Sequence, residues 1–217
     1  MLSAIVFLPL AGALAIATIV RSEKQVKYVA AAVALADLVL ALIAFFGMYD
    51  TGGARFQLLQ GPYRWIPLIN VHYFLGVDGL SMPLVLLTGL LGFAAVLASW
   101  NISLRVREYF VWLLVLQTAV MGVFASLDFV LFFLFWELEL IPMYFLISIW
   151  GSGRKEYSAL KFLIFTLLGS AFMLVAILIL FLNTGTFDMT AYAQGGVINA
   201  RTLLVPLSMV FWLFFVA

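Results

Sequence analysis

The residues best suited to do chemistry are two acids and a proline in one apolar run. Glu137 and Glu139 lie two positions apart, and Pro142 follows three residues later. An ionisable residue near the middle of a membrane-spanning helix costs about 2.5–3.5 kcal/mol, so each acid is a candidate functional residue. Pro142 has no N–H for the carbonyl of Leu138, which predicts a helix kink and a free acceptor that water can reach.

The two acids are expected to act separately. A spacing of two residues turns about 200° around a helix, so Glu137 and Glu139 face nearly opposite ways and cannot share one proton. A carboxyl group in a low-dielectric environment is easily protonated, so it can load and release a proton. The alternative is a structural hydrogen bond between helices; we favour function for Glu137 and leave Glu139 open.

Three more charged residues are weaker candidates for proton translocation. Lys161 lies several helical turns from Glu137 in depth, so we expect it to snorkel or to stand at the cytoplasmic mouth of a proton path. Asp37, in the middle of an apolar run, is interpreted first as bonding a neighbouring helix or lining the interior. Asp78 lies near the outer start of the apolar run Phe74–Trp100, where a capping role explains it without chemistry.

The composition indicates which elements must position these residues. Hydrophobic residues make up 66% of the chain and charged residues 10%, and the mean hydropathy is +1.21. Soluble domains are only about 45–50% apolar, so this chain needs lipid as its solvent. We expect an all-α bundle of transmembrane helices that forms one domain over residues 1–217.

Six runs with few or no charges are long enough for full spans, and a seventh begins near the end of the chain. The predicted spans are Leu2–Val20, Tyr28–Tyr49, Phe74–Trp100, Tyr109–Leu127, Phe129–Trp150 and Phe162–Leu182, with the seventh starting at Leu203. The seventh run has 15 residues and no polar flank, so we expect the protein to continue beyond Ala217.

Loop charges predict an N-terminus on the outer side of the membrane. Eight basic residues fall in the loops of one side and three in those of the other, and basic loops favour the cytoplasm. The cytoplasmic set is Arg21, Lys24, Lys27, Arg105, Arg107, Arg154, Lys155 and Lys161, and the outer set is Arg55, Arg64 and Arg201.

The loops themselves carry further predictions. Two long, Gly-rich outer loops, residues 50–71 and 183–202, favour turns or hairpins. The link 126–128 is so short that the helices it joins must be antiparallel neighbours, with Asp128 placed to stabilise the start of the second.

Several classes of function are excluded by composition. The chain has no Cys and one His, His72, which is too few ligands for a haem, an iron–sulfur cluster or a zinc site. A net charge of +1 gives no basic surface for nucleic acid. No Ser/His pair, paired Asp or metal-ligand cluster lies at membrane depth, which disfavours an intramembrane enzyme.

Three stretches resemble the antiporter-like membrane subunits of respiratory complex I, most of all the chain called M or 4. They are Phe135–Ile147 with Trp150 and Gly151, Trp65–Pro67 with Leu75–Ser81, and Ser158–Phe162 with Phe165 and Thr166. The chain is similar to the first half of such a subunit, and the acid at Glu139 resembles the cyanobacterial and plastid versions.

The resemblance implies a function that composition alone does not. It makes Glu137 the helix-five carboxylate of a proton-translocating half-channel, whose partner is a lysine on a later, proline-broken helix. It implies that other membrane subunits surround this chain and that flavin, iron–sulfur clusters and quinone lie in or among partner subunits, with no cofactor here. It leaves open whether NADH or ferredoxin is the electron donor.

Two alternatives remain. Multisubunit cation/proton antiporters and membrane-bound hydrogenases use related subunits with the same central Glu, and a scaffolding subunit without transport is the second alternative. The resemblance implies an integral protein of the bacterial inner membrane, with a thylakoid or another energy-transducing membrane as the alternative location.

Overall fold

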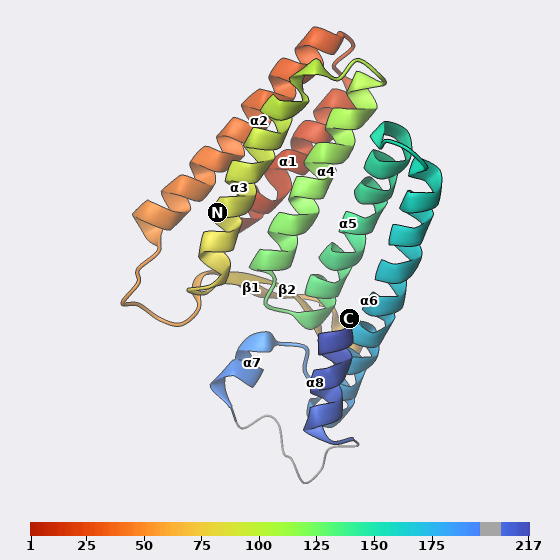
Figure 1. Ribbon diagram of the computed structural model, residues 1–217. Helices are drawn as coiled ribbons and strands as arrows, with labels where there is room; N and C mark the ends of the chain where they lie inside the picture. Colours follow the sequence, from red (N-terminus) through yellow and green to blue (C-terminus); the bar gives the residue numbers. More distant parts are fainter. Residues whose placement is uncertain (196–204) are drawn as a thin grey trace.

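The structure, a computed structural model, describes residues 1–195 and 205–217 and consists mainly of helices that run side by side (Figure 1). The helices are α1 (Leu2–Thr18), α2 (Glu23–Ile43), α3 (Ser81–Ala98), α4 (Val106–Ala125), α5 (Phe129–Trp150), α6 (Lys155–Thr184), α7 (Met189–Gln194) and α8 (Leu207–Val216). A π-helical turn, Ala44–Met48, extends α2, and 3-10 turns lie at Pro67–Ile69 and Ser99–Asn101. The predicted helical bundle is confirmed.

Five helices are long and apolar enough to cross a membrane. They are α2 with its π-helical turn, α3 with its 3-10 turn, α4, α5 and α6. The first predicted span is apolar, but α1 has only 17 residues, and α8 has 10. Of the six full spans predicted, five are therefore supported by helix length. The predicted start of the seventh span, Leu203, lies outside the described residues.

A two-stranded antiparallel hairpin lies across one end of the bundle (Figure 1). Its strands are β1 (Gln57–Ile66) and β2 (Val71–Val77). The first Gly-rich loop, predicted as residues 50–71, thus contains β1 and the turn of a hairpin, and β2 begins at its last residue. Gly61, in β1, has a φ of +107°, and a Cβ there would collide with the Tyr73 carbonyl, so this position requires glycine. The second loop contains α7 in its described part.

Several predicted helix starts were wrong. Helices α2 and α6 begin earlier than predicted, at Glu23 and Lys155, because each includes charged residues that the search for uncharged runs left out. The span predicted from Phe74 begins at Ser81, and residues 74–77 belong to β2. An apolar run of this length does not distinguish a buried strand from a helix by pattern alone. The pairing of β2 with β1 decides in favour of a strand, because it supplies hydrogen-bond partners across the hairpin.

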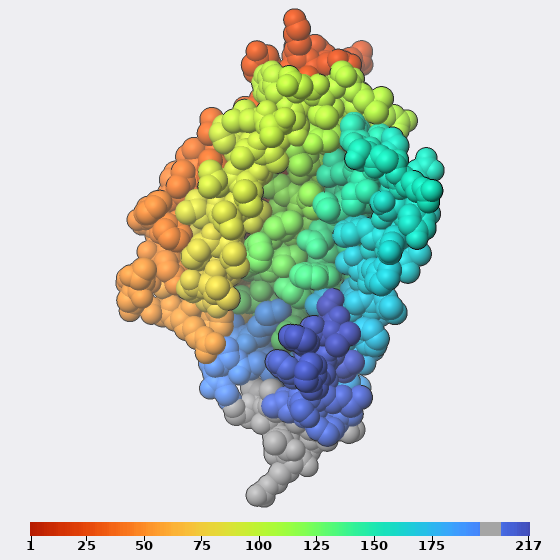
Figure 2. All heavy atoms as spheres, in the orientation of Figure 1, coloured from red at the N-terminus to blue at the C-terminus, as the bar shows by residue number. Residues whose placement is uncertain are grey.

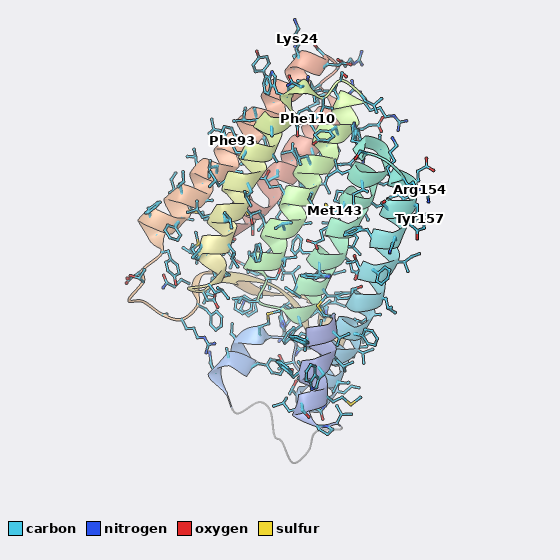
Figure 3. The ribbon with its side chains drawn as sticks, viewed as in Figure 1. Lys24, Phe93, Phe110, Met143, Arg154 and Tyr157 are labelled. Carbon is cyan, nitrogen blue, oxygen red and sulfur yellow. The ribbon has the colours of Figure 1, made fainter. Side chains whose placement is uncertain are left out.

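Helix α4 is the centre of the bundle, since it packs against α1, α2, α3 and α5. Figure 2 shows α4 recessed between α3 and α5 on one face, and α8 lying against α6. Buried apolar side chains from α1, α3, α4, α5 and β2 contribute to the largest core cluster. Figure 3 labels Lys24 and Arg154, which lie at the end of the bundle away from the hairpin. The two ends thus differ in charge as the loops predict.

Candidate functional site

The start of α5 is held by one buried carboxylate, Asp128. Its Oδ1 accepts hydrogen bonds from the backbone N–H groups of Val130 (2.9 Å) and Leu131 (3.2 Å). Its Oδ2 accepts from the backbone N–H of His72 in β2 (3.0 Å). Burial raises the pKa of Asp128, while these N–H donors and the charge of His72 oppose the rise. The expected helix-start role of Asp128 is confirmed, and Asp128 also ties α5 to the hairpin.

Aromatic packing determines how α5 is rotated against α4. The ring of Phe135 lies where a Cβ on Gly122 of α4 would stand, so the two helices approach closely there. Nearer the other end, the rings of Trp112 and Phe145 stack with centroids 4.6 Å apart. These contacts hold the segment between Phe135 and Phe145, which contains both glutamates, in one orientation.

Glu137 is partly buried, and its Oε1 is fully buried without a hydrogen-bond partner among the described residues. Leaving a buried polar atom unpaired costs about 1–3 kcal/mol, and more for a charged group. Such a carboxyl needs a proton, a water molecule or a further polar group to be satisfied. Glu139 is also partly buried, but neither of its oxygens is a buried, unpaired atom. The two acids thus differ in environment.

Pro142 is buried in α5, which continues as one helix from Phe129 to Trp150. Because proline has no N–H, the carbonyl of Leu138 receives no hydrogen bond from position 142. That carbonyl lies one residue from both glutamates, so two turns of α5 hold two carboxyl groups and a backbone acceptor without its usual donor. The kink at Pro142 stays a prediction.

Lys161 lies apart from the glutamates. It is exposed on α6, and its Nζ lies 5.8 Å from the centroid of the Phe165 ring. At about 1.5 Å per residue, Lys161 is roughly 9 Å from the start of α6, whereas Glu137 is roughly 20 Å from the adjoining end of α5. In the part of the chain that the structure describes, Lys161 forms no ion pair with Glu137 or Glu139.

Asp78 caps the start of α3. Its Oδ1 accepts from the backbone N–H groups of Leu80 (3.0 Å) and Ser81 (2.7 Å), and its own N–H donates to Ser81 Oγ (2.9 Å). Burial alone would raise the pKa of Asp78, but these hydrogen bonds and the charge of Arg55 outweigh burial and lower it. The geometry supports the capping interpretation.

A cavity of about 590 Å³ lies between α3, α4, α5, α6 and α8. Asp78, Ser81 and Ser126 line it near the hairpin end, and Trp136, the chain neighbour of Glu137, also lines it. The cavity therefore reaches from a helix-capping acid to the turn of α5 that carries the deep glutamate.

Asp37 is fully buried on α2, where the side-chain amide of Gln117 on α4 donates a 2.7 Å hydrogen bond to its Oδ2. The expected bond to a neighbouring helix is confirmed. Sequence reasoning missed Gln117 as the partner, although an amide inside an apolar span was a visible signal.

Among residues 1–195 and 205–217, no group of three His, Cys, Asp or Glu side chains could hold a metal ion.

Comparison with known proteins agrees with the resemblance. Residues 126–217 match a family described as "NADH:quinone oxidoreductase/Mrp antiporter, TM". NAD(P)H-quinone oxidoreductase chain 4 of Gloeobacter violaceus is 45% identical over 194 residues, which cover 88% of this chain and 36% of the relative. The chain thus spans about a third of the length of the curated relatives it matches.

Two solved structures share the fold. A chain of respiratory complex I from Thermus thermophilus matches with a TM-score of 0.79 and 23% identity, over 100% of this chain and 42% of that one. A chain of an archaeal membrane-bound sulfane sulfur reductase matches with a TM-score of 0.80 and 22% identity, over 98% and 43%. This chain is therefore similar to membrane subunits of the NADH:quinone oxidoreductase and Mrp antiporter family, by the family model over residues 126–217 and by a curated relative over 88% of its length.

Proposed function

We propose that this chain is part of a proton-translocating membrane subunit of a complex I-type quinone oxidoreductase, in which Glu137 binds and releases a proton. The proposal rests on Glu137 Oε1, which is buried and has no hydrogen-bond partner in the described part of the chain. An ionised carboxylate there lacks the donors that would stabilise its charge, whereas adding a proton removes the charge.

Two features support access for protons. The cavity beside Trp136 extends from the turn of α5 that carries Glu137 toward Asp78 and Ser81 near the hairpin end. The acceptor left free by Pro142 gives water a bonding partner next to both glutamates. In this proposal Glu139 is a secondary proton group, and Lys161 stands at the cytoplasmic mouth of the path.

Electron transfer belongs to other chains in this proposal. Flavin, iron–sulfur clusters and quinone lie in or among partner subunits, and this chain contributes no redox group. Other membrane subunits and lipid surround it, in a bacterial plasma membrane or a thylakoid. NADH and ferredoxin are both compatible with the chain as electron donors.

The test replaces Glu137 by Gln in the full-length chain within its assembled complex. This change keeps the size and removes the titrating group, so proton pumping coupled to quinone reduction should fall at least tenfold while the complex assembles. Glu139→Gln should reduce pumping less, and Glu108→Gln, at a half-exposed acid in the first turn of α4, should leave pumping unchanged. Normal pumping in Glu137→Gln would refute the proposal.

A second candidate is a cation/proton antiporter subunit, which the family description that matches residues 126–217 favours. Transport that depends on sodium, measured in vesicles that contain the assembled complex, would distinguish this candidate from a proton-translocating subunit. A scaffolding subunit, the third candidate, predicts that Glu137→Gln impairs assembly or changes nothing.

A further inference from the structure

A second buried acid lies in a different part of the bundle from α5. Asp37 on α2 has no exposed surface, and Gln117 on α4 is only 4% exposed. The amide Nε2 of Gln117 donates a hydrogen bond to Asp37 Oδ2 at 2.7 Å. The other two polar atoms of this pair, Asp37 Oδ1 and Gln117 Oε1, are both buried and have no partner among the described residues.

Both unpaired atoms are oxygens, which accept hydrogen bonds when Asp37 is ionised. One proton on Asp37 Oδ1 changes this, because an acid O–H can donate to the amide oxygen while the amide N–H donates to Oδ2. A carboxylic acid and a primary amide can pair in this way through two hydrogen bonds. A single proton thus removes the charge and supplies the donor that the pair lacks.

Among residues 1–195 and 205–217, no neighbouring charge stabilises an ionised Asp37. The helices that pack on α2 are α1, α3 and α4, and neither α1 nor α3 contains an ionisable side chain. The charged residues of α4 are Arg107 and Glu108, with Tyr109 the other titratable group; all lie in its first turns, about 12 Å or more from Gln117 along the axis. On α2 itself, Glu23, Lys24, Lys27 and Tyr28 lie at its start, about 13 Å or more from Asp37.

Helix α3 holds the amide in place. A Cβ on Gly92 would lie 2.5 Å from the Cδ and Oε1 atoms of Gln117, so the amide packs directly on the α3 backbone. Gly89, one turn earlier on α3, is a useful contrast, because a Cβ there would have ordinary contacts of 3.4 Å or more. A groove of about 250 Å³ between α3 and α4 has Gln117 and Gly92 in its lining, so the Gln117 side of the pair adjoins this groove.

We infer that Asp37 and Gln117 form a second proton-binding site, in which Asp37 carries one proton at neutral pH and donates it to the amide oxygen of Gln117. The site is separate from Glu137 and does not depend on the function proposed above. It is a property of the α2, α3 and α4 group of helices.

Infrared difference spectroscopy tests the site in the full-length chain within its assembled complex. The carbonyl of a protonated carboxyl group absorbs at a different infrared frequency from a carboxylate. The wild-type spectrum minus the Asp37→Asn spectrum at neutral pH should therefore contain one carboxylic acid band. A carboxylate band in its place would overturn the inference. A carboxylate band that responds to sodium would indicate a bound cation at Asp37, and one that does not would indicate a water molecule.

A matched pair of glycine variants keeps the test decisive if Asp37→Asn fails to assemble. Gly92→Ala should push the amide of Gln117 away from Asp37, so the acid carbonyl loses its donor and its band shifts. Gly89→Ala, on the same helix, should leave the band where it is. A carboxylic acid band that is the same in both variants would contradict the assignment to Asp37.

Discussion

In this chain, the acids at the helix ends and the acids inside the helices differ in the hydrogen-bond donors that the backbone offers them. Asp78, Asp128 and Asp188 each accept hydrogen bonds from backbone N–H groups at the start of a helix. Asp37 and Glu137 lie within helices, where the backbone N–H groups are used by the helix itself, and each has a buried oxygen without a partner among the described residues. An acid therefore stabilises the fold where the backbone offers donors, and needs a proton where it does not.

The largest effect on stability is expected at Asp128. Replacing it by Ala removes the acceptor for two N–H groups of α5 and for the partly buried N–H of His72, which together should cost about 2–4 kcal/mol. Thermal unfolding of the purified full-length protein measures this loss. Asp128→Asn keeps an acceptor oxygen and should recover at least half of it.

The same experiment sharpens the comparison at Glu137. Glu137→Gln should leave the unfolding temperature unchanged or higher, because it removes a carboxyl that has no donor. If Glu137→Gln destabilised the protein as much as Asp128→Ala, the deep glutamate would be a structural bond, and the contrast between the two kinds of acid would be lost.

A smaller effect is expected at Asp78. Ala in its place removes the cap from α3, which should cost about 1 kcal/mol, the usual value for a lost helix cap. Asp78→Asn, which can still accept at the helix start, should cost a few tenths of this in the same unfolding assay. Equal losses for Ala and Asn would indicate that the charge, rather than the hydrogen bond, does the stabilising.

The smallest effect is a difference in the sign of pH dependence between two helix caps. The folded state lowers the pKa of Asp78, so its contribution to stability is present above the ordinary value of about 4 and is lost as the pH falls. The folded state raises the pKa of Asp128, so the folded protein binds more protons there and stability falls as the pH rises from about 4.

Unfolding between about pH 3 and pH 6 checks these signs. The stability advantage of wild type over Asp78→Asn should grow as the pH rises, whereas its advantage over Asp128→Asn should shrink. A common sign in both comparisons would show that burial does not outweigh the N–H donors at Asp128.

Much of this fold follows from local sequence. The bounds of α5 were predicted at Phe129 and Trp150, because a capping acid and a polar link mark one end and a Gly-rich basic loop marks the other. The charge difference between the two ends of the bundle was also readable, since flanking loops carry it. Glu137 stood out as a candidate because an acid in an apolar run is costly wherever the chain folds.

Other features were decided by tertiary structure alone. The strand at residues 74–77 lies in a run that the sequence predicts as helix, because only pairing with β1 distinguishes a strand from a helix there. Asp37 and Gln117 lie 80 positions apart, and His72 and Asp128 lie 56 apart, so each pair meets only when helices or strands pack. Sequence determines which side chains need a partner in lipid, through the cost of burying them, whereas packing determines which distant residue supplies that partner.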